Sequence, residues 1–550
     1  MTQKIRKRGS WADHLLLLAL IGVVLLFVVW PVLAITLHSF QDRGGFTLSY
    51  YQELLNDRNR VMLWNSLWTA GLSALISVFF AVVLSLYTFI SHRRTKYLLE
   101  RACMIAMISP PFVSSLAYIT LFGRRGLITY GWLGLHFTPY GPHGIVLLES
   151  MGGIAFASLL LLSNLDQIDA YQLLASRDLG AKAGTTLRTV VFPKLLPGIL
   201  SAYFLLFTMN LSDFSTPIAI GGDFKVLAEE AYLQAISTPF LGKAAAISVA
   251  LVPVSIIASY FYRMNMKNRD TSTVRSGSFF DSNYRMEARP LLRGLLFLPV
   301  LLYFAVVILK YGTIFLSAFS NTARGYIQWT AEYIQDLPPT FFQSLFHSLI
   351  FSALAGLISS SIGFTISYYN DRRGQRGMNL VEFFANLPYL IPGIFFGLGY
   401  VAAFSGPPLM LRGTAVILIA NYVFRQLTVP VKNANAGFKA LSPKLDQAAR
   451  DLGATQLQLL RTVLLPPLMP HFISSFITVF TSSMSSMGAI AFLVSPGMNV
   501  GSMEIFNAVI MGSYGVASLE AVILMFAIAI VNLLAFGVLQ ASRRKRRRKG

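Results

Sequence analysis

Long apolar runs alternate with short polar segments along the whole chain. Each run is close to the roughly 20 helical residues that cross the hydrocarbon core of a bilayer. The longest polar stretch, 263–289, is rich in Ser, Asn and Arg and divides the runs into two sets. The pattern predicts six spans, a linker and six further spans, near 15–37, 64–90, 98–122, 144–164, 197–220, 244–262, 291–318, 342–369, 381–405, 413–430, 470–494 and 517–540.

The first apolar run follows a short basic segment that contains Lys4, Arg6, Lys7 and Arg8. A cleaved signal peptide has the same order of charge and apolar residues. The run is longer than the apolar core of a signal peptide, so we favour a first span that is retained as an anchor, with a signal peptide as the alternative.

Composition makes the membrane interpretation stronger. Of the 550 residues, 55% are hydrophobic and only 13% are charged, which excludes an ordinary soluble enzyme and a disordered chain. The formal net charge is nevertheless +21. If the N-terminus is cytoplasmic, 35 of the 45 Lys and Arg residues lie on the cytoplasmic side. This asymmetry is the positive-inside rule, and it predicts a multi-pass protein of the cell inner membrane with both termini cytoplasmic.

The sequence lacks the residues that several other classes of function require. The single cysteine, Cys103, excludes an intrachain disulfide and a cysteine-based metal site, and the seven histidines form no cluster. No phosphate-binding Gly-rich loop is present. We therefore expect no catalytic residues, no metal and no cofactor bound by this chain. The basic tail, Arg543–Lys549, is expected to meet anionic membrane lipid and no nucleic acid.

The chain contains an internal repeat. The sequence Arg-Asp-Leu-Gly-Ala occurs at 177–181 and again at 450–454, and Arg-Thr-Val follows at 188–190 and at 461–463, so the copies differ by 273 positions. Upstream, Ser66, Pro110 and Tyr118 match Ser348, Pro392 and Tyr400 at a difference of 282. The first half therefore has nine extra residues, which we assign to 123–144. Two parallel halves predict a pseudo-two-fold axis along the membrane normal.

The repeated loops are predicted to form a helix, a turn and a second helix on the cytoplasmic face. Gly180 and Gly453 are placed to end the first helix in a left-handed conformation. Pro193 and Pro466 are expected to stop the second helix before the next span. Two long, matched loops at equivalent positions favour a docking site for a partner over a plain connector.

These loops resemble a known motif: Glu-Ala-Ala, three residues, Gly, nine residues, Ile, one residue and Leu-Pro, the EAA motif of ABC importer permeases. The first copy reads Leu-Ala-Ser at 174–176, with Gly180, Val190 and Phe-Pro at 192–193. The second reads Gln-Ala-Ala at 447–449, with Gly453, Val463 and Leu-Pro at 465–466. The Glu of the motif is absent from both copies, while the spacing is kept.

The resemblance covers nearly the whole chain and implies an all-α integral membrane fold of two fused six-helix type I ABC permease domains, with about 12 transmembrane helices. The expected divisions are a first permease domain at 1–263, a cytoplasmic linker at 264–290, a second permease domain at 291–541 and a basic tail at 542–550. The coupling loops would lie at about 165–196 and 431–469.

The same resemblance implies the machinery around the chain. Two copies of an ABC ATP-binding subunit, which hold ATP and Mg, would bind the coupling helices, and a periplasmic binding protein would deliver the solute for alternating access. The implied coupling residues are Ala175, Arg177, Asp178, Gly180, Pro193, Ala448, Ala449, Arg450, Asp451, Gly453 and Pro466.

Fused permeases of this length resemble the ferric-iron transport group, and the segment Asp-Phe-Ser-Thr-Pro at 213–217 looks like one of its common segments. Iron(III) is therefore the expected solute. Thiamine, a phosphonate or another small phosphorylated compound remain alternatives. A bare iron(III) ion prefers hard oxygen ligands, and the spans contain few carboxylates, which favours an organic or chelated form.

Polar residues inside spans are candidates for the translocation path, because burying them in lipid is costly. Glu149, Glu520 and Lys310 are more simply explained as residues near span ends. The candidates for the path itself are Asp213, Ser212, Ser215, Ser485, Ser486 and Met487.

Two other classes were weighed. An ion-coupled secondary transporter also uses repeats, but it needs no ATPase and would not require two matched coupling loops. A membrane enzyme needs a catalytic constellation such as paired aspartates or a histidine cluster, and the sequence shows none.

Overall fold

The computed structural model describes residues 11–547, apart from 268–289 and the single or paired positions 92, 137, 167, 239, 324, 376, 390, 443 and 456–457. The first half comprises α1 (Trp11–Val24), η1 (Leu25–Val29), α2 (Trp30–His38), β1 (Gln41–Asp42), β2 (Gly45–Phe46), α3 (Ser49–Leu54), α4 (Asp57–Ile90), α5 (Arg93–Ala106), α6 (Pro111–Phe122), η2 (Leu127–Trp132), α7 (Pro142–Leu165), α8 (Ala170–Asp178), α9 (Ala183–Thr186), η3 (Leu187–Val191), α10 (Phe192–Leu211), α11 (Ser215–Ile220), α12 (Leu227–Ser237) and α13 (Gly242–Lys267).

The second half has the same order of elements. It comprises α14 (Pro290–Ala318), β3 (Ser320–Asn321), β4 (Gln328–Trp329), α15 (Glu332–Gln335), α16 (Pro339–Ser367), η5 (Tyr368–Arg372), α17 (Met378–Ala385), η6 (Leu387–Tyr389), α18 (Gly393–Phe404), α19 (Ala415–Arg425), α20 (Thr428–Ala440), α21 (Lys444–Asp451), η7 (Leu459–Leu464), α23 (Leu465–Met484), η8 (Ile490–Phe492), α24 (Gly501–Ile510) and α25 (Tyr514–Arg547).

Within the described residues, nine helices are long and apolar enough to cross a membrane, and the bent pair Met378–Tyr389 and Gly393–Phe404 is a candidate for a tenth, broken span. The other two predicted spans, near 98–122 and 413–430, coincide with pairs of shorter helices, α5 with α6 and α19 with α20. All twelve predicted runs therefore fall on helices. Five of them cross a helix break, because the runs near 197–220 and 470–494 also extend past the ends of α10 and α23. Apolar length alone does not reveal these breaks.

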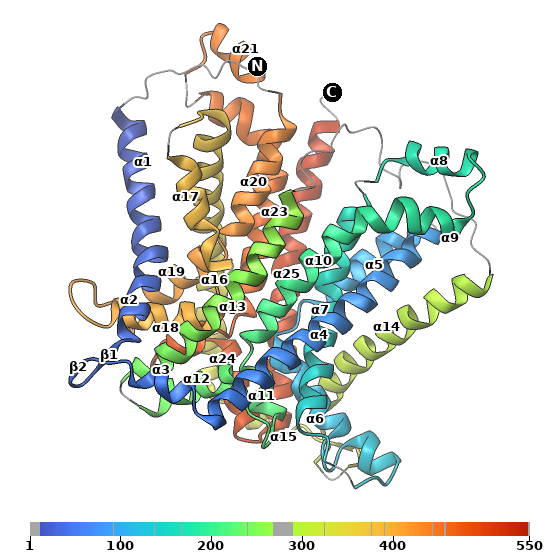
Figure 1. Ribbon diagram of the computed structural model, residues 1–550, viewed down its shortest axis with the longest axis vertical. Helices are drawn as coiled ribbons and strands as arrows, with labels where there is room; N and C mark the ends of the chain where they lie inside the picture. The colour runs from blue at the N-terminus through green and yellow to red at the C-terminus, as the bar shows by residue number, and fades with distance from the viewer. Residues whose placement is uncertain are drawn as a thin grey trace.

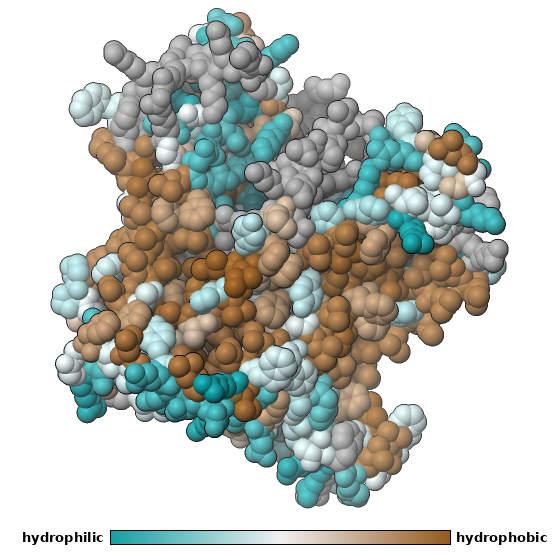
Figure 2. All heavy atoms as spheres, viewed as in Figure 1, coloured by the Kyte–Doolittle hydropathy of each residue, from teal (hydrophilic) through white to brown (hydrophobic). Residues whose placement is uncertain are grey.

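The helices run between two polar ends. The start of α1, the end of α25, and helices α8 and α21 lie at one end, which is the top of Figure 1. The hairpin of β1 with β2 and the short helices α11, α12 and α24 lie toward the opposite end. Figure 2 shows an apolar band around the middle with hydrophilic residues above and below. This band is the surface that lipid would cover.

The first span of each half packs against the other half. In α1–α2, the backbone oxygen of Phe27 accepts a hydrogen bond from Tyr400 Oη at 2.8 Å, and the Phe27 ring stacks on Phe424 at 5.0 Å. Trp30 Nε1 donates to Ala403 O at 3.3 Å. The first apolar run is thus integrated into the core of the second half.

The exchange is reciprocal, because α14 packs on α4 and α6 of the first half. Lys310 Nζ donates to Ser109 Oγ at 2.8 Å and lies 4.6 Å from the ring centre of Tyr311. Tyr311 Oη donates to Ile105 O at 2.9 Å. Lys310 therefore holds α14 against the break between α5 and α6, and its place is not the span end expected from the sequence.

Equivalent contacts confirm the internal repeat. Ser66 Oγ accepts from the backbone N–H of Leu227 at 2.8 Å, and Ser348 Oγ accepts from that of Gly501 at 2.8 Å. The extra residues also lie where expected, since 19 residues separate α6 from α7 (123–141) and 10 separate α18 from α19 (405–414). The insertion contains η2.

The expectation that proline stops the second loop helix is wrong. Short π-helical turns, η3 and η7, run without a break into α10 and α23, which place Pro193 and Pro466 in their first turns. A proline has no N–H to donate, and the first turn of a helix and a neighbouring π-turn both tolerate that loss. The continuous helices Gly184–Leu211 and Leu459–Met484 are candidate spans. Most of the predicted linker 264–290 and the end of the tail lie outside the described residues.

We predict that Tyr400→Phe lowers the free energy of unfolding by about 1 kcal/mol, because it removes the hydroxyl that joins α18 to Phe27. Thermal unfolding in detergent measures the change. Tyr260→Phe is the control, because Tyr260 is exposed. Equal melting temperatures for Tyr400→Phe and the unmodified chain would contradict a stabilising role of the hydrogen bond between Tyr400 and Phe27.

Candidate functional site

Two matched knobs protrude from the end of the molecule that carries α8 and α21 (Figure 1). We define the knobs as residues 170–181 and 444–454. In the first, Gly180 has φ +79° and its N–H donates to Arg177 O, while Ala181 N donates to Ser176 O. This is a Schellman motif, in which a left-handed residue closes the helix.

The second knob repeats this geometry. Gly453 has φ +81°, its N–H donates to Arg450 O at 2.8 Å, and Ala454 N donates to Ala449 O at 3.0 Å. The predicted role of both glycines in ending the helices is confirmed. Because a side chain at positive φ is strained, the turn depends on glycine.

Each knob presents one leucine almost fully to solvent. Leu179 is 88% exposed and Leu452 is 89% exposed, at equivalent positions directly before the glycine. An exposed large apolar side chain at the same place in two copies is typical of a protein contact. In the sequence, this contact is indicated by the leucine that both Arg-Asp-Leu-Gly-Ala segments share.

Most of the predicted coupling residues lie on the exposed surface of these knobs. Ala175, Arg177 and Asp178 are exposed in the first knob, and Ala448, Arg450 and Asp451 are exposed in the second, while Ala449 is buried. Pro193 and Pro466 are separate from the knobs, in the first turns of α10 and α23.

Fixed charges attach the knobs to the spans. In the first half, Lys96 pairs with Asp166 at the base of the loop, and Asp169 Oδ1 accepts from Tyr171 N at 2.9 Å as an N-cap. In the second half, Arg372 Nη2 donates to Phe438 O at 2.8 Å and to Leu441 O at 2.7 Å. These contacts fix the segments that lead into the knobs to neighbouring helices.

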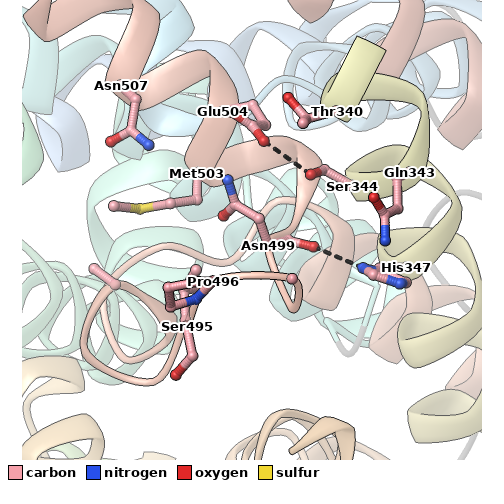
Figure 3. Close-up of a pocket in the computed structure, with 13 residues that line it drawn as sticks. Thr340, Gln343, Ser344, His347, Ser495, Pro496, Asn499, Met503, Glu504 and Asn507 are labelled. Atoms are coloured by element: carbon pink, nitrogen blue, oxygen red, sulfur yellow. Dashed lines mark hydrogen bonds between the residues drawn. The ribbon is translucent and has the colours of Figure 1, made fainter. Parts of the chain in front are cut away.

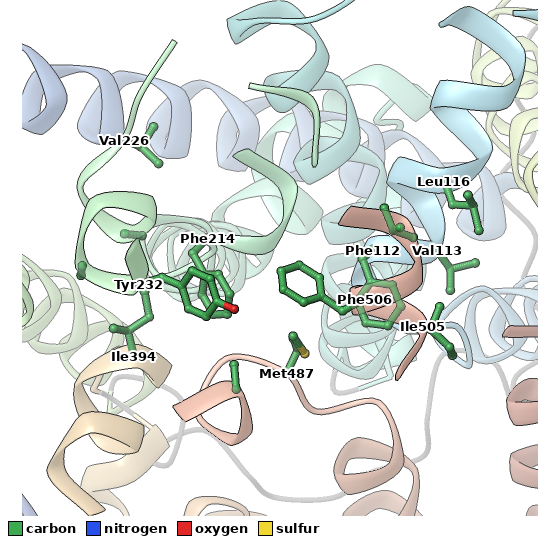
Figure 4. Close-up of a cluster of buried hydrophobic side chains, with 14 of the residues drawn as sticks. Phe112, Val113, Leu116, Phe214, Val226, Tyr232, Ile394, Met487, Ile505 and Phe506 are labelled. Carbon is green, nitrogen blue, oxygen red and sulfur yellow. The ribbon is translucent and has the colours of Figure 1, made fainter. Parts of the chain in front are cut away.

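The two halves also meet in an apolar plug, defined as Phe112, Phe214, Tyr232, Ile394, Met487 and Phe506 (Figure 4). All six side chains are buried. The rings of Phe214 and Tyr232 are stacked, with their centres 4.5 Å apart. The ring of Phe506 makes T-shaped contacts with both, and its centre lies 6.2 Å from that of Phe214 and 6.1 Å from that of Tyr232.

The plug follows the repeat. Tyr232 in α12 and Phe506 in α24 differ by 274 positions, and Phe112 in α6 and Ile394 in α18 differ by 282. Phe214 and Met487 follow α10 and α23, the two equivalent spans. Three pairs of equivalent residues therefore close the interface between the halves. Sequence analysis found only Met487, because an aromatic ring in an apolar span does not stand out from its neighbours.

The other predicted path residues have mostly local partners. Asp213 accepts hydrogen bonds from Ser215 N, Ser215 Oγ and Thr216 Oγ1 at 2.9, 2.7 and 2.6 Å and so holds the start of α11. Ser212 and Ser485 donate to carbonyl groups of their own helices. The backbone oxygen of Ser486 accepts a hydrogen bond from Ser502 Oγ at 3.1 Å. These groups lie beside the plug and present no carboxylate that is free of partners.

Glu149 and Glu520 are both buried, so neither is the solvated span-end residue that the sequence favoured. In each, one carboxylate oxygen has no hydrogen-bond partner. No group of three His, Cys, Asp or Glu residues that could hold a metal ion occurs in the described part of the chain. The arrangement can dock partners and open or close a path.

Comparison with known proteins agrees with this geometry. The family model "Binding-protein-dependent transport system inner membrane component" matches residues 73–268 and 368–548, one match in each half. The ferric transport system permease protein FbpB of Actinobacillus pleuropneumoniae is 28% identical over 529 residues, which cover 92% of this chain and 75% of that protein.

Two further relatives were found. A putative ferric transport system permease protein FbpB 1 of Haemophilus influenzae is 28% identical over 500 residues, 88% of this chain and 78% of that protein. The thiamine transport system permease protein ThiP of Salmonella typhimurium is 32% identical over 184 residues, 32% of this chain and 34% of that protein. With its two matched halves, the chain belongs to the family of inner membrane components of binding-protein-dependent transport systems, as a non-catalytic ABC importer permease with two fused permease domains.

Proposed function

We propose that this chain is the permease of an importer for iron(III), in which two ATP-binding subunits dock on the knobs and drive the opening of the plug. Members of the family work with an ATP-binding subunit and a substrate-binding protein. The observation that carries the proposal is the pair of superimposable Schellman turns, each with one exposed leucine. Two equal knobs fit two copies of one ATP-binding subunit.

The orientation follows from charge. With the knobs in the cytoplasm, the N-terminal segment, the C-terminal tail and both coupling loops lie on the side that carries 35 of the 45 Lys and Arg residues. The opposite end, with α12 and α24, then faces the periplasm and receives the binding protein. ATP and Mg would be held by the docked subunits and not by this chain.

Transmission to the path would use the continuous helices after the knobs. Each knob leads through its π-turn into α10 or α23, and these spans end beside Phe214 and Met487 of the plug. Closure of two ATP-binding subunits would move the knobs together and change the angle between α10 and α23. The ring of Phe506 would then separate from the rings of Phe214 and Tyr232, since it belongs to the other half.

Iron(III) is favoured as the solute because two relatives that match along most of the chain at 28% identity are ferric permeases, while the thiamine relative matches about a third of it. The described residues contain no metal-ligand cluster. We therefore expect iron to cross as a chelate without a fixed metal site in the path. Thiamine is the second candidate.

The solute is tested by uptake into proteoliposomes that contain the permease, its ATP-binding subunits and the binding protein. We expect ATP-dependent accumulation of radiolabelled iron that excess thiamine does not reduce. Accumulation of labelled thiamine without accumulation of iron would overturn the choice of solute and leave the permease assignment intact.

The double substitution Leu179→Asp with Leu452→Asp is predicted to abolish co-purification of the ATP-binding subunit, because it places a charge in the apolar contact of both knobs. Each single substitution should weaken the association by about tenfold, the loss typical of a central contact residue. Leu55→Asp is the matched control, a leucine that is exposed after a short helix at the opposite end. Full association in the double variant would refute docking through the knobs.

The substitution Tyr232→Ala is predicted to let a small polar dye leak through proteoliposomes without ATP, because it removes a ring stacked at the centre of the plug. Phe89→Ala is the control, since Phe89 is equally buried but belongs to a separate cluster beside the first loop. Both substitutions should destabilise the fold by about 3–5 kcal/mol. A leak in both variants, or in neither, would argue against the plug as the seal.

A further inference from the structure

The second half contains a polar pocket of about 360 Å³ beside the start of α16. Its lining includes Thr340, Ser344 and His347 from α16, Asn499 from the loop before α24, and Glu504 and Asn507 from α24 (Figure 3). Thr340 is exposed, and His347, Glu504 and Asn507 are partly exposed. The pocket therefore opens at the end of the molecule that is opposite the knobs.

Inside the pocket, the carboxylate of Glu504 has a neutral hydrogen-bond partner and, within the described ranges, no basic one. Ser344 Oγ donates to Glu504 Oε1 at 2.9 Å, and His347 Nδ1 lies 3.1 Å from Asn499 O. No Lys or Arg forms an ion pair with Glu504 among the residues that the structure describes. In this part of the chain, the pocket thus holds one carboxylate that has no basic partner.

The first half shows how an equivalent site is neutralised. Its matching contact joins Asn65 Nδ2 to Lys225 O at 3.0 Å, in the positions of His347 and Asn499. The same correspondence aligns Glu230 with Glu504, at a difference of 274, and Arg58 with Thr340, at a difference of 282.

At that position in the first half, each of two acidic side chains forms a salt bridge with a basic one. Arg58 Nη2 lies 3.5 Å from Glu230 Oε2, and Lys225 Nζ lies 2.5 Å from Glu229 Oε1. In the second half, Thr340 replaces Arg58, while Asn499 and Met503 replace the other pair, Lys225 and Glu229. The fold keeps the acid as Glu504 and removes its one internal counter-charge, and both Thr340 and Glu504 line the pocket.

We propose that this pocket binds the guanidinium or ammonium group of an external molecule, in the place that Arg58 occupies in the first half. A single carboxylate matches one positive charge, and the amide oxygen of Asn499 can accept further N–H groups. The described residues offer no third His, Cys, Asp or Glu ligand for a metal ion. The pocket is independent of the solute that the path carries.

Two sources could supply such a group: a small organic cation in solution, or a lysine or arginine side chain of a docked binding protein. Both would use the same N–H donors. The probe is methylguanidinium chloride, and the readout is the rate at which a thiol reagent modifies Asn507→Cys in a Cys103→Ser background. Leu233→Cys is the matched control, because Leu233 holds the equivalent position on α12.

We expect a cationic methanethiosulfonate to react with the cysteine at 507 about tenfold faster, relative to an anionic one, than with the cysteine at 233, since negative potential concentrates cations. Methylguanidinium at about 1–10 mM should slow the reaction at 507 alone. Glu504→Gln and Thr340→Arg should each remove this protection, the first by removing the charge and the second by restoring the internal cation.

Three outcomes would overturn the proposal: no protection by methylguanidinium, equal protection by tetramethylammonium, which has no N–H donor, or protection that persists in both Glu504→Gln and Thr340→Arg. Added binding protein identifies the source. If it competes with methylguanidinium at 507 and not at 233, a side chain is the source, and without competition a small cation is the source. Both results support the pocket.

Discussion

The exchange of first spans between the two halves is the contact on which the rest of the structure depends. Phe27 and Trp30 pack into the second half through Tyr400, Phe424 and Ala403, and α14 packs on the first half through Lys310 and Tyr311. Neither half is then complete without the other. Separation of the halves would expose the polar groups of these contacts to lipid, which offers them no hydrogen-bond partners.

The two ends of the molecule follow the pseudo-symmetry of the halves to different degrees. The knobs are nearly identical down to the hydrogen bonds of their Schellman turns, as the proposed docking of two copies of one subunit requires. The opposite end is less symmetric, because Arg58 pairs with Glu230 in one half while Thr340 leaves Glu504 without a cation in the other. The pseudo-symmetry is therefore close at the knobs and looser at the pocket.

Sequence reasoning located the spans and the repeat because these features have strong physical causes. A bilayer demands long apolar helices, and a left-handed turn demands Gly180 and Gly453. The prolines were misread, since a rule about helix interiors was applied to residues that lie in a first turn after a π-turn. Asp213 was expected on the path, but its own neighbours Ser215 and Thr216 satisfy it. Phe214, Tyr232 and Phe506 were missed because apolar residues in apolar spans give no contrast, and the pocket at Glu504 needed the three-dimensional alignment of both halves.

The central claim is that the knobs and the plug move as one device. Spin labels at Asp178→Cys and Asp451→Cys report the distance between the knobs, and labels at Ser212→Cys and Ser485→Cys report the spans beside the plug, all in a Cys103→Ser background. Distances measured by pulsed electron paramagnetic resonance, with and without trapped ATP on the docked subunits, test the coupling. The account predicts that both distances change together when ATP is trapped. Knobs that approach each other while the distance beside the plug stays fixed would contradict it.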